Sequence, residues 1–282
     1  MIEWLETNHA GAFCASTSIE RNDRKYHGLL VCPISGLEGR YHILSAVDAS
    51  VMDGSGLTLG TNRYPGTEYP ESFRFIEKTE FMPWPSWVYR RGKTAVRKDI
   101  FMRKNEAAVW LAYTIEDGPD EAELDLKFLF TYRNCHELTK ANDQINCGIK
   151  TDSEGLWFRP YSGLPGAVIT FSGTWHHEGT IYWDYNACYE MEKERGHEWM
   201  EDRFVPGKIT ASVQKNIPLV IRVGISEAYG CKGGPGKEKM IAVCKAEKKS
   251  RLAEIGMPKE QNQILRKNES HYIIKNYSSS RT

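Results

Sequence analysis

The segment 123–130 constrains the fold of this chain most strongly, because apolar and charged residues alternate along it. The apolar residues recur at every second position: Leu124, Leu126, Phe128 and Phe130. The charged residues Glu123, Asp125 and Lys127 occupy the alternate positions and face the other way. A period of two places successive side chains on opposite faces of a β-strand, so one face is buried and the other meets water. Burial on one face is typical of antiparallel sheets.

Further runs rich in β-branched and aromatic residues indicate that strands continue from Ala12 to about Ser226. The clearest of these runs are 26–32, 73–82, 94–103 and 107–115. Turn dipeptides such as Asp53-Gly54 separate them. Strands and helices do not alternate, which argues against a parallel α/β fold. The pattern therefore predicts a mainly β protein built from packed antiparallel sheets.

The chain changes character after Gly230. Residues 231–237 have the composition of a flexible linker. Apolar residues at near-helical spacing then predict a helix that ends at Gly256 and Pro258: Met240, Val243, Cys244, Leu252 and Ile255. A second helix is expected over 259–272. We thus expect a β domain over 1–229, and over 230–282 a flexible loop with two amphipathic helices, whose apolar stripes could drive self-association.

Composition excludes several classes of function. Lys plus Arg and Asp plus Glu both number 37, and this neutrality argues against nucleic acid as a partner. No apolar run is long enough to cross a membrane, and the first residues do not form a secretory signal. The seven cysteines are scattered, odd in number and without a CxxC motif, which favours reduced thiols and a cytoplasmic location.

Motifs for cofactors and metals are weak. The glycines at 230–237 fail as a phosphate loop, because their spacing is wrong and Glu238 replaces the Ser or Thr that would hold Mg²⁺. The neighbours His176 and His177 would point to opposite faces of a strand, so they would chelate one ion poorly. No nucleophile elbow is present. We expect neither a metal nor a cofactor.

The segment 21–31 carries more information. Arg24, Lys25, Tyr26 and His27 precede an apolar strand, and Gly28 would let another group approach the backbone closely. Arginine and aromatic side chains commonly hold the hydroxyl groups and C–H faces of sugars. The same residues could instead be structural, with Arg24 binding a loop carboxylate and His27 buried in the core.

Several segments together resemble one family. Residues 3–8, Glu-Trp-Leu-Glu-Thr-Asn, followed by residues 24–31, Arg-Lys-Tyr-His-Gly-Leu-Leu-Val, closely resemble the N-terminal domain of bacterial and archaeal glycogen debranching enzymes, the amylo-α-1,6-glucosidases. The resemblance continues in order through 61–64, 83–89, 130–139, 190–196 and 202–207. One departure lies at 8–13, where only Gly11 remains of the family's glycine-rich turn.

The resemblance implies an antiparallel β-supersandwich, similar to galactose-mutarotase-like domains and to the N-terminal domain of bacterial glucoamylases. In that family the sandwich precedes an (α/α)₆ barrel that hydrolyses α-1,6-glucosidic branch points and carries the catalytic carboxylates. No catalytic residue is therefore assigned here, and the terminal helices would link sandwich and barrel. The implied partners are glycogen or another α-glucan and the barrel of the same polypeptide.

Six residues in these motifs are candidates for glucan contact: Asn8, Arg24, Tyr26, His27, Arg133 and His136. They could equally support an interface between sandwich and barrel, where Arg and aromatic residues are also enriched. Two further functions stay open. A stand-alone mutarotase-like epimerase would pair a Glu with His27 or His136. A glucan-binding module would use an aromatic platform of Trp84, Trp87, Trp175 and Trp183.

Overall fold

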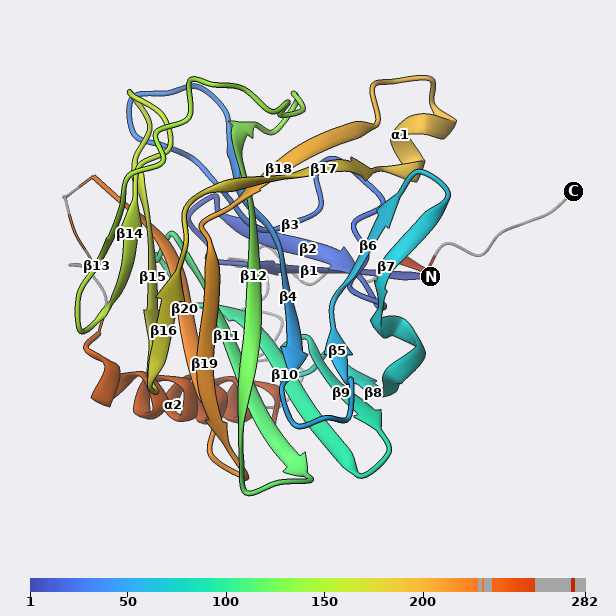
Figure 1. Cartoon of the computed structure of the whole chain (residues 1–282), viewed down its shortest axis with the longest axis vertical. Helices are drawn as coiled ribbons and strands as arrows, with labels where there is room; N and C mark the ends of the chain where they lie inside the picture. The colour runs from blue at the N-terminus through green and yellow to red at the C-terminus, as the bar shows by residue number, and fades with distance from the viewer. Residues whose placement is uncertain (228–229, 231–234, 257–274, 277–282) are drawn as a thin grey trace, which may run out of the picture.

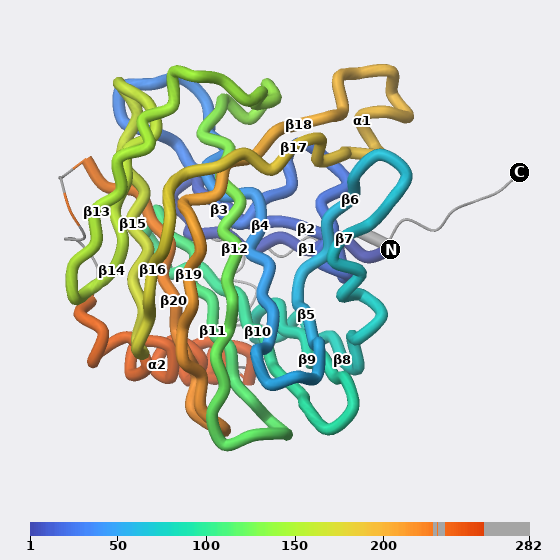
Figure 2. Tube along the Cα trace, in the orientation of Figure 1, coloured from blue at the N-terminus to red at the C-terminus, as the bar shows by residue number. Residues whose placement is uncertain are grey.

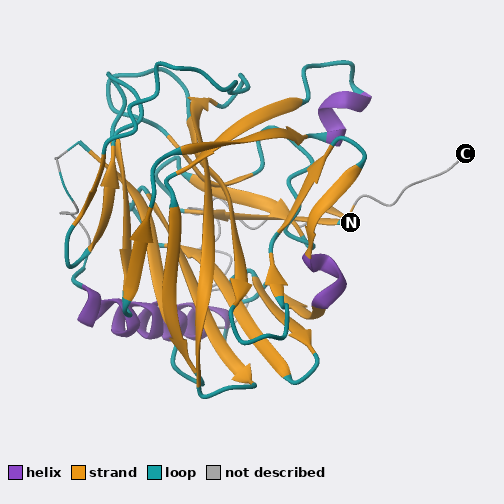
Figure 3. Cartoon of the chain, in the orientation of Figure 1, coloured by secondary structure: helices purple, strands orange, loops and turns teal. Residues whose placement is uncertain are grey.

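The computed structural model describes residues 1–227, 230, 235–256 and 275–276. Two twisted antiparallel sheets face each other, and one long helix lies against the outside of one sheet (Figure 1). Colouring by secondary structure shows that strands make up most of the molecule (Figure 3). The predicted mainly β, antiparallel sandwich is confirmed. The predicted second helix at 259–272 and most of the predicted linker lie outside the described residues.

The first sheet contains, within the described residues, eleven strands. Its main path runs in the order β16-β19-β12-β4-β3-β2-β1-β21, with β5, β17 and β18 attached beside it. The bounds are β1 (Ile2–Thr7), β2 (Phe13–Thr17), β3 (Gly28–Cys32), β4 (Tyr41–Val51), β5 (Thr58–Leu59), β12 (Glu121–Asn134), β16 (Trp175–Glu178), β17 (Tyr182–Cys188), β18 (Met200–Val205), β19 (Lys208–Gln214) and β21 (Lys275–Asn276).

The second sheet has eight strands in the described part of the chain, in the order β13-β14-β15-β20-β11-β10-β9-β8. The bounds are β8 (Ile76–Glu80), β9 (Ser86–Arg91), β10 (Thr94–Met102), β11 (Ala108–Asp117), β13 (Ile149–Thr151), β14 (Gly155–Phe158), β15 (Gly166–Phe171) and β20 (Leu219–Ser226). The hairpin β6 (Thr61–Tyr64) and β7 (Thr67–Glu71), the 3₁₀ helix η1 (Ser72–Phe75), α1 (Glu190–Glu194) and α2 (Lys237–Ile255) complete the described elements.

The core lies between the two sheets, and β12 shows why the sequence folds this way. Its alternate residues Leu124, Leu126, Phe128 and Phe130 are all buried in this core. Antiparallel pairing with β4 on one side and β19 on the other fixes its register. The period-two prediction is confirmed, because a shift of one residue would turn the apolar face outward.

The outside of the second sheet is apolar and is covered by α2. Trp84, Phe101 and Trp110 stack in series, with ring centroids 4.6 and 5.8 Å apart. Met240 and Cys244 of α2 are buried against this stack, which removes the indole and phenyl rings from water. The helix predicted from Met240 to Ile255 is thus confirmed.

One arginine fixes the C-terminal half of α2 to the sandwich. The Nη1 atom of Arg251 lies 2.6 Å from Glu6 Oε1, and its Nη2 atom donates a hydrogen bond to the Met102 carbonyl at 2.5 Å. The Glu6 side chain is 2 % exposed, so the ion pair is largely removed from water. By contrast, Leu252 and Ile255 on the same helix are 50 % and 42 % exposed.

The outside of the first sheet is covered by polar contacts instead. Asn62 of the β6–β7 hairpin donates to both carboxylate oxygens of Asp48 on β4, at 2.9 and 2.8 Å. Arg203 of β18 donates to Asn62 Oδ1 at 2.7 Å and to Asp184 Oδ2 at 2.7 Å. Lys127 of β12 lies 2.5 Å from the other oxygen of Asp184. We call these five side chains the outer polar network.

Among the described residues, none of the helices combines the length and the apolar character that a membrane-spanning segment needs.

Candidate functional site

Five of the six candidate residues gather at one end of the first sheet. Arg24, Tyr26 and His27 lie in the loop between β2 and β3, and Arg133 and His136 lie at the end of β12 and just after it. The short helix α1 packs against the same loop, because the Met191 N–H donates to the Asp23 carbonyl at 3.0 Å. In Figure 2, β3, β18 and α1 lead to this end of the molecule.

Arg24 and His27 share one carboxylate. Arg24 Nε donates to Glu3 Oε1 at 2.6 Å, and His27 Nε2 lies 3.4 Å from the same oxygen. His27 Nδ1 accepts the Asp23 N–H at 3.2 Å, which assigns the ring proton of a neutral His27 to Nε2, facing Glu3. These two partners lower the pKa of Glu3 to about 2, His27 contributing most, so this carboxyl stays ionised at neutral pH.

Arg133 is the centre of a second, fully buried group. Its guanidinium holds both oxygens of Glu201, a side chain with 0 % exposure, and Nη2 also donates to the Lys25 carbonyl at 2.7 Å. Glu201 accepts further hydrogen bonds from the Tyr189 hydroxyl and from the Thr139 N–H. This group ties the loop that carries Tyr26 to the loop that carries His136.

The half-buried Tyr26 and the exposed His136 form what we call the exposed rim of the site. The Tyr26 hydroxyl lies 3.2 Å from His136 Nδ1, and the two rings meet edge to face with centroids 5.7 Å apart. Lys25 Nζ donates to the His136 carbonyl at 2.8 Å and lies 5.5 Å from the centre of the Tyr26 ring. Aromatic, imidazole and ammonium groups thus meet solvent together.

Asn8 lies apart from the other candidates, at the opposite end of β1 from Glu3. Its side-chain oxygen accepts the N–H groups of Ala10 and Ala12 at 2.8 and 2.9 Å. Its amide donates to the Glu106 carbonyl at 3.0 Å. With 2 % exposure, Asn8 organises the turn after β1 and faces no solvent.

The close approach expected at Gly28 is confirmed. A Cβ atom at this position would lie 2.3 Å from His42 Nε2, which is closer than any side chain could tolerate. The imidazole instead reaches the His27 carbonyl, at 2.7 Å. Burial lowers the pKa of His42 well below its usual value, so the ring is neutral and its N–H bonds the loop to β4.

The carboxylates of this arrangement are poorly placed for proton transfer in glycoside hydrolysis. Cleavage of a glycosidic bond needs a carboxylic acid with a raised pKa beside a second carboxylate. Glu3 has a lowered pKa, and Glu201 is saturated by an arginine, a tyrosine and an N–H group. Asp48 has a pKa raised by burial to about 6, but it lies beneath the β6–β7 hairpin in the outer polar network.

The four tryptophans do not form one platform. Trp84 and Trp87 are 1 % and 0 % exposed, so neither can offer a ring face to a sugar. Trp175 stacks on Phe171 with centroids 4.9 Å apart, and Trp183 packs edge-on against Phe204. The proposed platform is therefore wrong, because apolar burial in separate parts of the sandwich uses most of these rings.

The sequence reasoning missed the residues that organise the site, above all Glu3, Tyr189 and Glu201. Glu3 lies inside a family-like segment, 3–8, but no spacing rule pairs it with a residue 21 positions away. Glu201 lies beside the segment 202–207 and is 68 residues from Arg133. A signal existed in the sequence of β18, where three charged residues, Glu201, Asp202 and Arg203, follow one another directly before the apolar residues Phe204 and Val205. Among the described residues, no group of His, Cys, Asp and Glu is arranged to hold a metal ion.

A family model described as glycogen debranching enzyme N terminal matches residues 2–219 of this chain. Among solved structures, a bacterial glucoamylase complexed with acarbose is similar, with 12 % sequence identity and a TM-score of 0.46. The match covers 94 % of this chain and 35 % of the glucoamylase chain, so the chain spans about a third of that protein. No curated protein is detectably similar in sequence.

Proposed function

This chain belongs to the family of glycogen debranching enzyme N-terminal domains, and we propose that it is the non-catalytic N-terminal domain of an amylo-α-1,6-glucosidase. Its role is to support a catalytic (α/α)₆ barrel of the same polypeptide. The barrel would hydrolyse α-1,6 branch points of glycogen or a related α-glucan. In this proposal the domain boundary separates the β part, 1–229, from the helical part, 230–282.

One observation carries the non-catalytic assignment: the carboxylates of the candidate site are neutralised by neighbours. Glu3 is shared by Arg24 and His27, and its pKa is held at about 2. A general acid at neutral pH needs the opposite shift. The same contacts hold the loop in one conformation, which suits a surface that positions the catalytic barrel.

The exposed rim supplies the contact surface in this proposal. Tyr26, His136 and Lys25 offer an aromatic edge, an imidazole and a cation to solvent. We assign them to contact with the glucan or with the barrel wall beside it, and we assign the buried Arg133 to support. No cofactor is required, because hydrolysis by two carboxylates needs none.

A cytoplasmic location fits the thiols. Six cysteines in the described residues are free: Cys14, Cys32, Cys135, Cys147, Cys188 and Cys244. Free buried thiols favour a reducing compartment. Self-association through the terminal helices remains part of the proposal, and size-exclusion chromatography with light scattering measures it directly.

The test is an activity comparison. The purified 282-residue chain should release no glucose from branched limit dextrin, and the polypeptide extended by its barrel should release it. Activity of the chain alone would refute the proposal. Titration with maltooligosaccharides then separates glucan contact from interface support: a Tyr26→Ala, His136→Ala chain should bind more weakly than a matched Tyr185→Ala chain, altered at an exposed tyrosine outside the site.

A second function deserves one experiment, because a Glu and a His do meet in the structure. Glu3 and His27 lie 3.4 Å apart, the residue pair that a mutarotase would need. Burial of His27 to 4 % exposure and the lowered pKa of Glu3 disfavour proton exchange with a sugar. A polarimetric assay with α-glucose should show no acceleration, and clear acceleration would favour the epimerase.

A further inference from the structure

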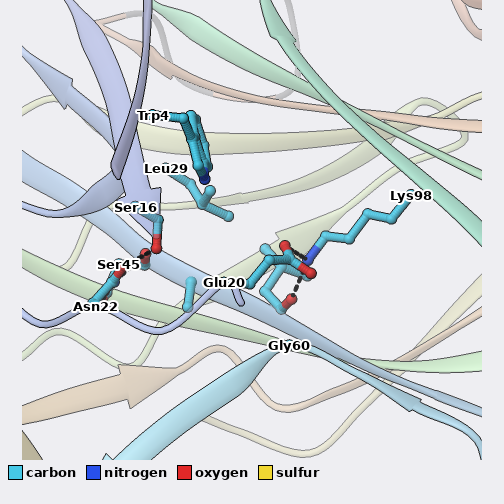
Figure 4. A pocket seen from close by; sticks show the side chains of 10 residues that line it. Trp4, Ser16, Glu20, Asn22, Leu29, Ser45, Gly60 and Lys98 are labelled. Carbon is cyan, nitrogen blue, oxygen red and sulfur yellow. Dashed lines mark hydrogen bonds and ion pairs between the residues drawn. The ribbon is translucent and has the colours of Figure 1, made fainter. Parts of the chain in front are cut away.

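A small cavity lies between the two sheets, next to a buried pair of charged residues (Figure 4). Its volume is about 10 Å³. Lys98 of β10, in the second sheet, and Glu20, in the loop after β2 of the first sheet, both line it. A cavity of this size has room for one water molecule and excludes any larger ligand.

Both side chains of the charged pair are more than nine-tenths buried. The Lys98 side chain is 1 % exposed and the Glu20 side chain 5 % exposed, with Lys98 Nζ 2.6 Å from Glu20 Oε1. Lys98 Nζ also donates to the Val47 carbonyl at 3.1 Å. The Tyr89 hydroxyl donates to the second oxygen of Glu20. A carboxylate has about four acceptor positions, so Glu20 keeps capacity for a further partner.

A second polar group lines the same cavity. The Ser16 hydroxyl donates to Asn22 Oδ1 at 2.7 Å, and Asn22 Nδ2 donates to Ser45 Oγ at 3.3 Å. Ser16 and Ser45 are 3 % and 1 % exposed, so bulk water does not reach them. Because Ser45 Oγ accepts in this chain, its own hydrogen remains available to a molecule in the cavity.

We propose that this cavity holds one ordered water molecule, hydrogen-bonded to at least two of Glu20, Lys98 and Ser45. Buried waters occupy polar cavities that offer two to four partners, whereas apolar cavities of similar size stay dry. The water donates to the Glu20 carboxylate and accepts from the Lys98 ammonium or the Ser45 hydroxyl. It lowers the cost of keeping two charges away from bulk solvent.

The water site bears on the candidate loop, because Glu20 lies near the start of this loop. Glu20 has a φ of 56°, in the left-handed region that a non-glycine residue rarely adopts. Such a conformation persists where surrounding contacts over-determine it. The bonds from Lys98 and Tyr89, completed by the water, hold Glu20 and so the start of the loop that carries Arg24 and His27. This inference goes beyond the proposed function and does not depend on it.

The first test is a high-resolution crystal structure of the wild-type chain. A well-ordered water peak within hydrogen-bonding distance of two of the three groups is expected. A cavity without density, or one closed by a moved side chain, would overturn the proposal.

The second test counts long-lived internal waters in solution by magnetic relaxation dispersion of water. Replacing the charged pair with apolar residues, Glu20→Leu with Lys98→Met, leaves Ser45 alone of the three groups and should remove one long-lived water. Ser50→Ala, a matched change on the outward face of the same strand as Ser45, should leave the count unchanged. An equal count in the wild type and the double variant would overturn the proposal, and if the double variant does not fold, the wild-type crystal structure decides.

Discussion

On the outside of the second sheet α2 covers stacked aromatic rings, whereas on the outside of the first sheet the β6–β7 hairpin covers the outer polar network. Trp84, Phe101 and Trp110 make the first covered surface apolar. Asp48 and Arg203 make the second one charged. Both coverings bury side chains, but the first removes apolar rings from water and the second pairs charged and polar groups with one another.

Because of this difference, the stability of the two sides should respond differently to pH, to salt and to mutation. Burial of apolar area depends little on pH and salt, because no charge changes on burial. A buried charge network gains stability only while every partner is present and correctly ionised. We therefore expect the α2 side to respond to changes in volume and the hairpin side to changes in charge.

The largest effect should come from the apolar side. Trp84→Ala removes a 1 % exposed indole that stacks on Phe101 and donates a hydrogen bond to Asp99 at 3.0 Å. We expect a loss of about 4 kcal/mol in the free energy of unfolding, measured by urea denaturation. Trp175→Ala, at a half-buried site, is the matched control and should cost clearly less. Equal losses would mean that α2 does not seal this surface.

Next comes the charged side. Arg203→Met leaves Asp184, with 7 % side-chain exposure, without its strongest partner, although Lys127 still contacts it. The free energy of unfolding should fall by about 3 kcal/mol, because a buried carboxylate loses its guanidinium partner and keeps only Lys127 and the Tyr64 hydroxyl. Arg74→Met, which breaks an exposed pair with Glu71, should change it by less than about 1 kcal/mol. A small effect at Arg203 would remove the contrast between the two coverings.

A smaller, pH-dependent effect should distinguish the coverings directly. Burial raises the pKa of Asp48 from 3.8 to about 6, so the folded chain binds this proton more tightly than the unfolded chain. The contribution of Asp48 to stability therefore falls as pH rises through this range and is constant above it. Asp48→Asn, which stays neutral, should gain about 1–3 kcal/mol relative to the wild type between about pH 4 and pH 7.

Urea denaturation of both proteins across that pH range measures the difference. Parallel pH profiles for the wild type and Asp48→Asn would show that the Asp48 carboxyl keeps an ordinary pKa under the hairpin. Trp84→Ala provides the contrast, since its loss of stability should be nearly the same at every pH in the range.

The smallest effect should come from the outward face of α2. Leu252 is 50 % exposed, so Leu252→Ala should change the free energy of unfolding of the isolated chain by no more than about 0.5 kcal/mol. Met240→Ala, on the inward face of the same helix, should cost about 2–5 kcal/mol. A large cost at Leu252 would show that its side chain is covered in solution.

The sequence predicted those structural features that depend on the pattern of residues close together in the chain. Alternation from Leu124 to Phe130 gave the inward face of β12, and helical spacing gave α2 with Met240 and Cys244 buried. The same spacing also marked Leu252, which the structure leaves half exposed. Periodicity identifies a helix, but the length of the surface it covers depends on the sheet beneath it.

The candidate site was predictable only in part, for a physical reason. Arg24, Tyr26 and His27 are neighbours in sequence, so one motif points to all three. Their partners come from distant segments, as Glu201 does for Arg133, and ion pairing across a fold leaves no local period. Charge alone could not tell a sugar-facing arginine from one that holds a buried carboxylate.

The stack of Trp84, Phe101 and Trp110 beneath α2 has a practical consequence for anyone who wishes to shorten this protein. Cutting the chain between the end of β20 and Lys237 would uncover three aromatic rings and remove Arg251, the ion-pair partner of Glu6. We expect such a fragment to aggregate during purification, whereas a fragment that keeps residues through Gly256 should remain soluble. The β part and α2 should therefore be kept together in any shortened version of the protein.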